Sequence, residues 1–241
     1  WAAERGIMVT NTPDILNEEV ADTAIGLLLC TVRELPRADR YIRAGEWAKN
    51  GDFRLTASLR NRAVGMVGLG RIGKAIASRL DAMRVPVVYH TRRPQADVPY
   101  RHFADLIAMA RAVDVLLCIV PGGAATKHMI GAAVLEALGP DGILINMARG
   151  SVVDEPALIE ALRDGKILSA GLDVFANEPN VPAELIAMEN VVLLPHVGSA
   201  SAPTRAAMEQ LVVDNLVHWK NGQPPLTPVP ETPWPQTKAR A

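Results

Sequence analysis

Short apolar segments alternate with amphipathic ones from residue 63 to residue 195. Between the first two apolar segments, Ile72, Ala75, Ile76 and Leu80 recur at the spacing of one helix face. Strands that alternate with helices predict right-handed crossovers and a doubly wound α/β fold, in which helices cover both faces of a parallel sheet. Six brief apolar segments are the expected strands: 63–70, 85–90, 114–120, 142–148, 167–174 and 191–195.

The first part of the chain favours helices. Residues 17–35 begin with a capping Asn, carry acids in the first turn and continue into an apolar body, which predicts a helix. Pro36 should break or kink it, since proline removes a backbone donor and clashes with the preceding turn. A second helical piece should end at Gly45, and residues 46–61 are expected to form an irregular arm.

The two ends of the chain carry different signals. Residues 6–14 favour a strand and a turn, with no earlier strand for pairing, so we expect further residues upstream. The last helical pattern covers residues 202–222. Six prolines follow between Pro224 and Pro235, which predict an extended or poorly ordered tail.

Composition excludes several classes of protein. With 49% apolar and 21% charged residues, the chain can form one large or two small globular domains. Its net charge of -1 provides no general field for nucleic acid or an anionic membrane. The longest apolar run, residues 24–30, is far shorter than the ~20 residues of a membrane span. The first residues lack the basic start and apolar core of a signal peptide, and Cys30 and Cys118 lack a CxxC partner, so we expect a cytoplasmic protein with two buried thiols and no metal site.

A glycine motif joins the first predicted strand to the first predicted helix of the alternating region. Gly68, Gly70 and Gly73 form G-x-G-x-x-G around Arg71 and Ile72. The glycines allow a tight turn and a close backbone approach to a pyrophosphate, which meets the free N–H groups of the helix. The alternatives are a purely structural turn, a methyltransferase, or a short-chain dehydrogenase, although the Y-x-x-x-K motif of the last class is absent.

The second predicted strand ends in a cationic segment. An NAD site normally places Asp or Glu there to bind the ribose hydroxyls, but this chain has His90, Thr91, Arg92 and Arg93. Arginines and a hydroxyl can donate hydrogen bonds to a 2′-phosphate, whereas an acid would repel it. The segment therefore predicts NADPH as the preferred cofactor, with NAD possible at lower preference; a solvated turn is the alternative.

Polar residues follow the last three predicted strands. Arg149, Glu178 and His196 should all lie beyond the carboxyl edge of the sheet, where α/β ligands bind. A cation for a substrate carboxylate, an imidazole for proton transfer and a carboxylate for that imidazole suit reversible oxidation of a 2-hydroxy acid. Singly, each residue has another explanation: a helix cap for Arg149, an exposed turn for Glu178 and a structural role for His196.

Four stretches together resemble the D-isomer-specific 2-hydroxyacid dehydrogenases: VGLGRIGKAIA, NMARGSVVDEPALIEAL, AGLDVFANEP and LLPHVGSAS. Intervals of 29 and 18 residues between Arg149, Glu178 and His196 are similar to the glyoxylate and hydroxypyruvate reductase branch. The resemblance implies that Arg149 binds the 2-oxo acid, that His196 donates the proton, and that Glu178 keeps His196 protonated. It also implies that Asp173 faces the nicotinamide carboxamide, and that the cofactor is lined by Thr23, Val120, Met147, Ala148 and Gly198.

The resemblance also implies an architecture. A Rossmann-type nucleotide-binding domain is expected over 13–203, while 1–12 and 204–241 would belong to a substrate lobe whose remainder lies upstream. Residues 121–129 depart from the family pattern, so the resemblance predicts no shape for that loop. In the resembling family, the apolar helix from Asn17 and the arm around Trp47 pack two subunits together, so we expect a homodimer. The alternative function is a dinucleotide-binding protein without turnover, such as a sensor or an inactive fragment.

Overall fold

The computed structural model describes residues 1–232 and 234. It divides into two compact units, one made of residues 20–198 and the other of residues 1–19 with those from 199 onward. We describe each unit by itself.

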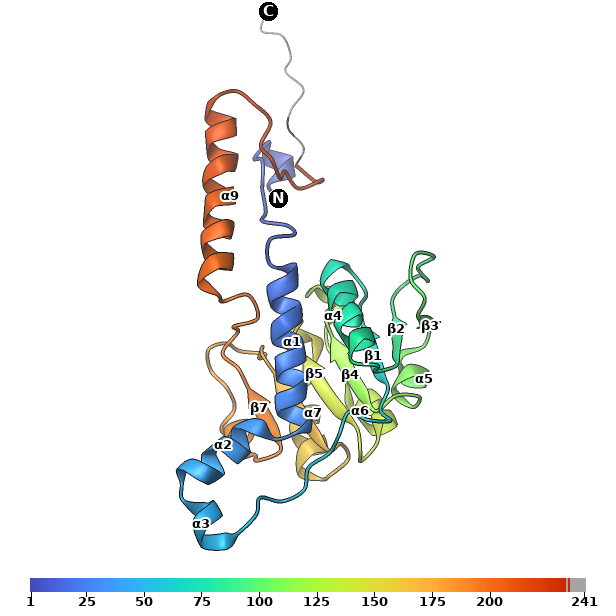
Figure 1. Ribbon diagram of the computed structural model, residues 1–241. Coiled ribbons are helices and arrows are strands. Elements are labelled where there is room, and N and C mark those ends of the chain that lie inside the picture. Colours follow the sequence, from blue (N-terminus) through green and yellow to red (C-terminus); the bar gives the residue numbers. More distant parts are fainter. Residues whose placement is uncertain (233, 235–241) are drawn as a thin grey trace, which may run out of the picture. The chain divides into compact units, whose positions relative to one another are not determined.

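The larger unit is built on one sheet of seven parallel strands, in the order β3-β2-β1-β4-β5-β6-β7 (Figure 1). The chain first adds strands on one side of β1 and then crosses to the other side, so the strand order reverses between β1 and β4. In such sheets ligands bind outside the carboxyl ends of the strands. The strands are β1 (Val64–Val67), β2 (Val87–His90), β3 (Arg101–Phe103), β4 (Val115–Cys118), β5 (Ile143–Asn146), β6 (Ser169–Leu172) and β7 (Val191–Leu193).

Helices flank this sheet, as the doubly wound α/β prediction requires. The first helix packs on β6, because a Cβ on Gly171 would lie 2.9 Å from Leu27 Cγ. The helices are α1 (Asn17–Val32), α2 (Leu35–Arg43), α3 (Glu46–Asn50), α4 (Arg71–Ala82), α5 (Leu106–Ala110), α6 (Ala132–Leu138), α7 (Glu155–Arg163) and α8 (Ala183–Ala187), with 3-10 turns at Ala124–Thr126 and Gly150–Val152.

The core explains the apolar pattern. All four residues of each of β1, β4, β5 and β6 are buried, so these strands need no polar alternation. Cys118 lies in this core, where burial raises the pKa of its thiol to about 12. Cys30 is partly buried, and burial raises its pKa as well. Both cysteines are free thiols.

The expected break near Pro36 falls slightly earlier. Glu34 adopts a left-handed conformation with φ of 48°, and α2 begins at the next residue. Pro36 therefore lies in the first turn of α2, where its missing N–H has no intrahelical partner to lose. The arm that follows contains a short helix, α3, which the sequence pattern did not indicate.

The smaller unit contains α9 (Ala202–Lys220) and a 3-10 turn, Ala3–Arg5. Thr10 pairs with Pro228 in an antiparallel bridge, and the Val229 N–H donates to Val9 O at 2.9 Å. The two ends of the chain are thus hydrogen-bonded within this unit. The substrate-lobe boundaries stay a prediction, and Pro233 and residues 235–241 of the proline tail lie outside the described residues.

Every helix within residues 1–232 and 234 is too short or too polar to cross a membrane. In the same residues, no three His, Cys, Asp or Glu side chains gather closely enough to hold a metal ion.

Candidate active site

The predicted polar residues follow the carboxyl ends of neighbouring strands. Arg149 comes three residues after β5, Glu178 six residues after β6 and His196 three residues after β7. Because parallel strands end at the same edge, residues far apart in sequence share this edge. It is the edge at which α/β proteins bind ligands.

His196 and Glu178 form the polar centre of this edge. His196 Nδ1 lies 2.7 Å from Glu178 Oε2, and Glu178 Oε1 accepts a hydrogen bond of 2.9 Å from the Phe175 N–H. The side chains are 49% and 33% exposed, respectively. The pair is therefore held in place while its imidazole remains open to a small molecule.

Several effects set the pKa of the Glu178 carboxyl. Partial burial raises the pKa. Hydrogen bonds from His196 and the Phe175 N–H, together with the positive charges of His196 and Arg149, lower the pKa by more than burial raises it. The net pKa lies below its usual value. Glu178 is consequently a carboxylate at neutral pH, and it lies within electrostatic reach of Arg149.

A buried carboxylate shapes the loop that carries His196. Asp173 is only 2% exposed. Its Oδ1 accepts a hydrogen bond of 2.7 Å from the Val197 N–H, and its Oδ2 accepts one of 2.8 Å from the Gly198 N–H. His196 has a left-handed φ of 55°, and its own N–H donates to Asp173 O at 2.9 Å. Asp173 thus fixes an unfavourable backbone conformation that places the imidazole.

The side chain of Arg149 lies against the loop that follows β4. A Cβ on Gly122 would lie 2.9 Å from Arg149 Cγ, so only glycine leaves room for this side chain without a shift. The guanidinium donates to Ala148 O at 2.5 Å through Nη1. The unusual loop sequence at 121–129 therefore provides space beside Arg149.

The turn before Glu178 is fixed by contacts that the sequence did not indicate. A Cβ on Gly150 would lie 1.8 Å from Phe175 O, so the backbone after Arg149 touches the backbone of this turn. Glu155 Oε2 accepts a hydrogen bond of 3.1 Å from the Ala176 N–H. Glu155 lies within the stretch 146–162 that carries the resemblance, but the sequence did not indicate this contact, because its partner lies 21 residues away in the chain.

The glycine turn has the shape that a pyrophosphate requires. Gly68 has a φ of 99°, and a Cβ there would lie 2.9 Å from Val120 Cγ1. A Cβ on Gly73 would lie 2.8 Å from Gly68 O, so α4 packs closely on the turn. Gly70 precedes α4 without a side-chain cap, and a Cβ there would meet nothing within 4 Å. The first N–H groups of α4, at Arg71 and Ile72, thus begin beside open space, which fits a dinucleotide phosphate.

Another set of predicted cofactor residues also lies together. Thr23 Oγ1 donates to Gly198 O at 3.1 Å. A Cβ on Gly198 would lie 3.0 Å from Asp173 Oδ2 and 3.2 Å from Met147 Cε. Ala148, the next residue after Met147, donates its N–H to Asn146 Oδ1 at 3.1 Å. Direct contacts thus join Thr23, Met147, Asp173 and Gly198.

Two side chains of the cationic segment after β2 already form hydrogen bonds within the chain. His90 Nδ1 lies 2.9 Å from Phe103 O, and Thr91 Oγ1 donates to Arg93 O at 2.7 Å. Because a hydroxyl has one proton, Thr91 can donate to a phosphate only if that bond opens. Within the described residues, the exposed side chains of Arg92 and Arg93 have no hydrogen-bond or ion-pair partner.

Gln95 connects this segment to the glycine turn. Its Nε2 donates to Leu69 O at 2.9 Å, and its N–H donates to Tyr89 Oη at 2.7 Å. No sequence pattern indicated this role, since Gln95 lies outside the motifs. The connection holds the arginine segment beside the turn that would bind the pyrophosphate.

Comparison with known proteins places these features in a family. The model of the "D-isomer specific 2-hydroxyacid dehydrogenase, NAD binding domain" matches residues 25–198. Glyoxylate/hydroxypyruvate reductase A of Arabidopsis thaliana is 49% identical over 226 residues, 94% of this chain and 72% of that protein. Glyoxylate reductase of Pyrococcus furiosus is 42% identical over 237 residues, 94% of this chain and 70% of that protein.

A solved structure matches closely as well. The NADPH-dependent glyoxylate/hydroxypyruvate reductase of Sinorhizobium meliloti, in complex with NADP and malonate, superposes with a TM-score of 0.95. It is 57% identical, and the match covers 98% of this chain and 74% of that one.

Proposed function

The chain belongs to the D-isomer specific 2-hydroxyacid dehydrogenase family, in its glyoxylate/hydroxypyruvate reductase branch, and we propose that it reduces a small 2-oxo acid to the D-2-hydroxy acid. One observation carries the proposal: the His196–Glu178 pair, at 2.7 Å, lies within electrostatic reach of Arg149. A dinucleotide-binding sensor without turnover would need the glycine turn but not this pair. The pair therefore favours the enzyme over the alternative.

Each residue of the site has a distinct task in this reaction. Arg149 binds the carboxylate of the 2-oxo acid, because its guanidinium can donate two parallel hydrogen bonds. His196 donates a proton from Nε2 to the carbonyl oxygen, since its Nδ1 is held by Glu178. Glu178, as a carboxylate, stabilises the imidazolium before that transfer.

The nicotinamide cofactor is held by a separate part of the sheet edge. The glycine turn and the first N–H groups of α4 would hold its pyrophosphate, for which they leave open space. The bound cofactor supplies the hydride. Asp173 stays a predicted neighbour of the nicotinamide, and its two carboxylate oxygens already accept hydrogen bonds from Val197 and Gly198.

NADPH is the preferred cofactor in this proposal. No acid follows β2, while Arg92 and Arg93 are exposed and, within the described residues, unpaired. Gln95 holds their segment beside the glycine turn. The related Sinorhizobium meliloti enzyme is NADPH-dependent and was solved with NADP. NADH remains a weaker substrate because most of the cofactor contacts are shared.

A homodimer is the proposed assembly. Large apolar side chains of α2, α3 and the arm are exposed: Leu35 47%, Ile42 53%, Trp47 56% and Leu55 95%. Such a patch is typical of a subunit interface. Light scattering at micromolar concentration should give the mass of two chains, and a monomer at that concentration would contradict the proposal.

The function is tested by turnover and product analysis. The chain is mixed with NADPH and either glyoxylate or hydroxypyruvate, and NADPH oxidation is followed by absorbance. Glycerate formed from hydroxypyruvate is then separated on a chiral column. We expect oxidation with both substrates and D-glycerate as the product. NADPH binding without oxidation would favour the non-catalytic alternative.

A further inference from the structure

A cavity with several charged residues in its lining lies at the edge of the sheet opposite the candidate active site. It has a volume of about 120 Å³ and is bounded by the end of α1, by α2, by the arm and by the amino ends of β6 and β7. Arg149, Glu178 and His196 follow the carboxyl ends of the strands, so they belong to the other edge. The lining includes Glu34, Arg37, Arg40, Arg54, Ser169 and Glu189.

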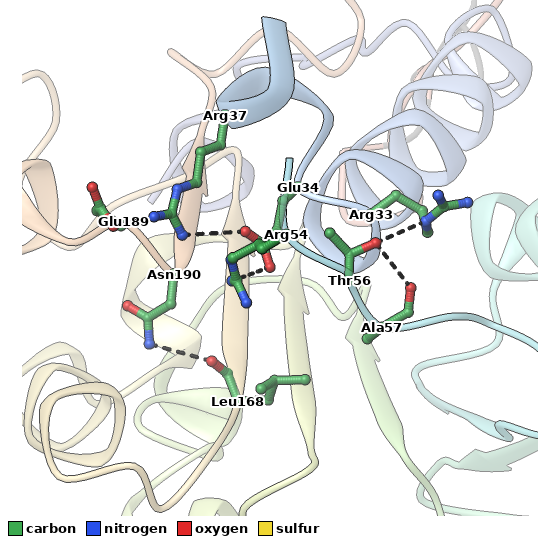
Figure 2. A network of polar contacts seen from close by, with 9 residues as sticks. All are labelled: Arg33, Glu34, Arg37, Arg54, Thr56, Ala57, Leu168, Glu189 and Asn190. Atoms are coloured by element: carbon green, nitrogen blue, oxygen red, sulfur yellow. Dashed lines mark hydrogen bonds and ion pairs between the residues drawn. The ribbon is translucent and has the colours of Figure 1, made fainter. Parts of the chain in front are cut away.

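The charges around this cavity do not cancel. Three arginines face two glutamates, which leaves one positive charge in excess. Glu34 binds two of the arginines: Arg54 contacts its Oε1, and Arg37 Nη1 lies 3.4 Å from its Oε2 (Figure 2). Arg37 Nη2 also lies 2.6 Å from Glu189 Oε2. Arg37 and Arg54 are thus held in position by the glutamates.

Arg40 is the charge in excess. Among residues 1–232 and 234, its guanidinium has no ion pair or hydrogen bond, although it lies on the same helix as the paired Arg37. A guanidinium offers five N–H donors and no acceptor, so the group that it can bind is an acceptor. Arg37 and Arg54 keep further N–H groups that their partners do not use.

Ser169 provides an independent sign of a ligand. Its side chain lies at the start of β6, is 7% exposed and lines the cavity. Within the described residues, its Oγ is a buried side-chain atom without a hydrogen-bond partner. Buried hydroxyls are normally hydrogen-bonded, because an unpaired one loses the interactions that it had in water. A hydroxyl next to a cavity with free arginine donors indicates that an acceptor binds there.

We propose that this cavity binds a small oxyanion, held by Arg40 with the support of Arg37 and Arg54 and by a hydrogen bond from Ser169. The volume accommodates a group of a few non-hydrogen atoms, and the excess positive charge favours an anion over a neutral molecule. Phosphate and carboxylate share the acceptor oxygens that the site requires. A bound oxyanion would join α2 and the arm to the strands β6 and β7.

The test uses calorimetric titration of the protein saturated with NADP⁺, so that the cofactor's phosphate sites are filled. Inorganic phosphate and acetate are titrated separately, which distinguishes the two sources of the oxyanion. We expect saturable binding of at least one of them. Arg40→Ala and Ser169→Ala should each weaken this binding by about 10- to 100-fold.

Arg43→Ala is the matched control. Arg43 lies on the same helix, does not line the cavity and pairs with Asp39 at 2.8 Å, so its removal should leave the titration unchanged. Ser169→Ala should fold normally, because it removes an unpaired buried hydroxyl. The proposal is overturned if neither anion binds saturably, or if Arg40→Ala and Ser169→Ala leave both titrations unchanged. If these variants change only the dissociation of the dimer and not the binding of either anion, the cavity is a contact between two copies and the proposal is likewise overturned.

Discussion

His196 Nδ1 lies 2.7 Å from Glu178 Oε2, although the two residues are 18 positions apart and follow different strands. The distance is that of a charge-assisted hydrogen bond. Glu178 is further held by the Phe175 N–H, so the carboxylate has little freedom to leave the imidazole. The pair is therefore the part of the site whose replacement gives the most specific predictions.

Glu178→Gln should alter the response of the protein to acid. The folded-state pKa of Glu178 is lowered, so its stabilising effect is complete above the ordinary pKa of 4.5 and is lost as pH falls through the lowered value. The variant should consequently be less stable than the unmodified protein at neutral pH. That difference should vanish in acid, as measured by urea unfolding across pH.

The same variant should change the rate–pH profile of reduction. Removing the carboxylate removes the charge that stabilises the imidazolium, so the decline in turnover with rising pH should move to lower pH. Glu184→Gln, at an exposed residue in the first turn of α8, is the control and should leave the profile unchanged. An identical decline in both variants would exclude Glu178 as the partner of the proton donor.

Asp173→Asn should slow turnover by loosening the loop that carries His196. Its two carboxylate oxygens accept N–H groups of Val197 and Gly198, and an amide can replace only one of them. We expect a loss of about 1–3 kcal/mol of unfolding free energy together with a lower kcat. Asp105→Ala removes the Oδ1 that accepts the N–H groups of Ile107 and Ala108 at the start of α5, so it should lower stability by about 1 kcal/mol but leave kcat unchanged.

Gly150→Ala should destabilise the protein strongly. The added Cβ would lie 1.8 Å from Phe175 O, a backbone atom that cannot move without displacing the Glu178 turn. We expect a loss of about 3 kcal/mol or more, measured by urea unfolding. Gly131→Ala is the control, because its Cβ would lie 3.6 Å from His128 O, and it should cost about 1 kcal/mol or less. Equal stability of the two variants would contradict the close approach.

Arg92→Ala combined with Arg93→Ala should weaken the binding of NADPH much more than the binding of NADH. If one or two contacts with the 2′-phosphate contribute about 1.5–3 kcal/mol each, and salt screens part of this energy, their loss should reduce the preference by roughly 10- to 1000-fold. Arg163→Ala, at the end of α7, is the control and should leave the binding of both cofactors unchanged. Equal kcat/KM with NADPH and NADH in the unmodified protein would show that the segment is only a turn.

The sequence predicted what depends on local pattern. Continuous apolar runs marked the buried strands, and the position of Arg149, Glu178 and His196 after three of them predicted a common edge. β3 escaped prediction because its three residues are partly or fully exposed and carry no apolar run. Residues 46–50 form the helix α3 within the expected irregular arm.

Long-range contacts could not be predicted in the same way. The tie between Glu155 and the Ala176 N–H, and that between Gln95 and Leu69 O, join segments 21 and 26 residues apart. His196 has its left-handed φ in a loop held by Asp173, and these two residues follow the neighbouring strands β7 and β6. Such contacts arise from the tertiary fold, and no local residue pattern encodes them.

The central claim is that His196 donates the proton during reduction of a 2-oxo acid. The most direct measurement compares steady-state oxidation of NADPH with glyoxylate by the unmodified protein and by His196→Ala, with NADPH affinity determined separately for each. The account predicts that the variant loses about 10²- to 10⁴-fold in turnover, the usual contribution of general acid catalysis, while its NADPH affinity stays nearly unchanged. Turnover of His196→Ala equal to that of the unmodified protein would contradict it.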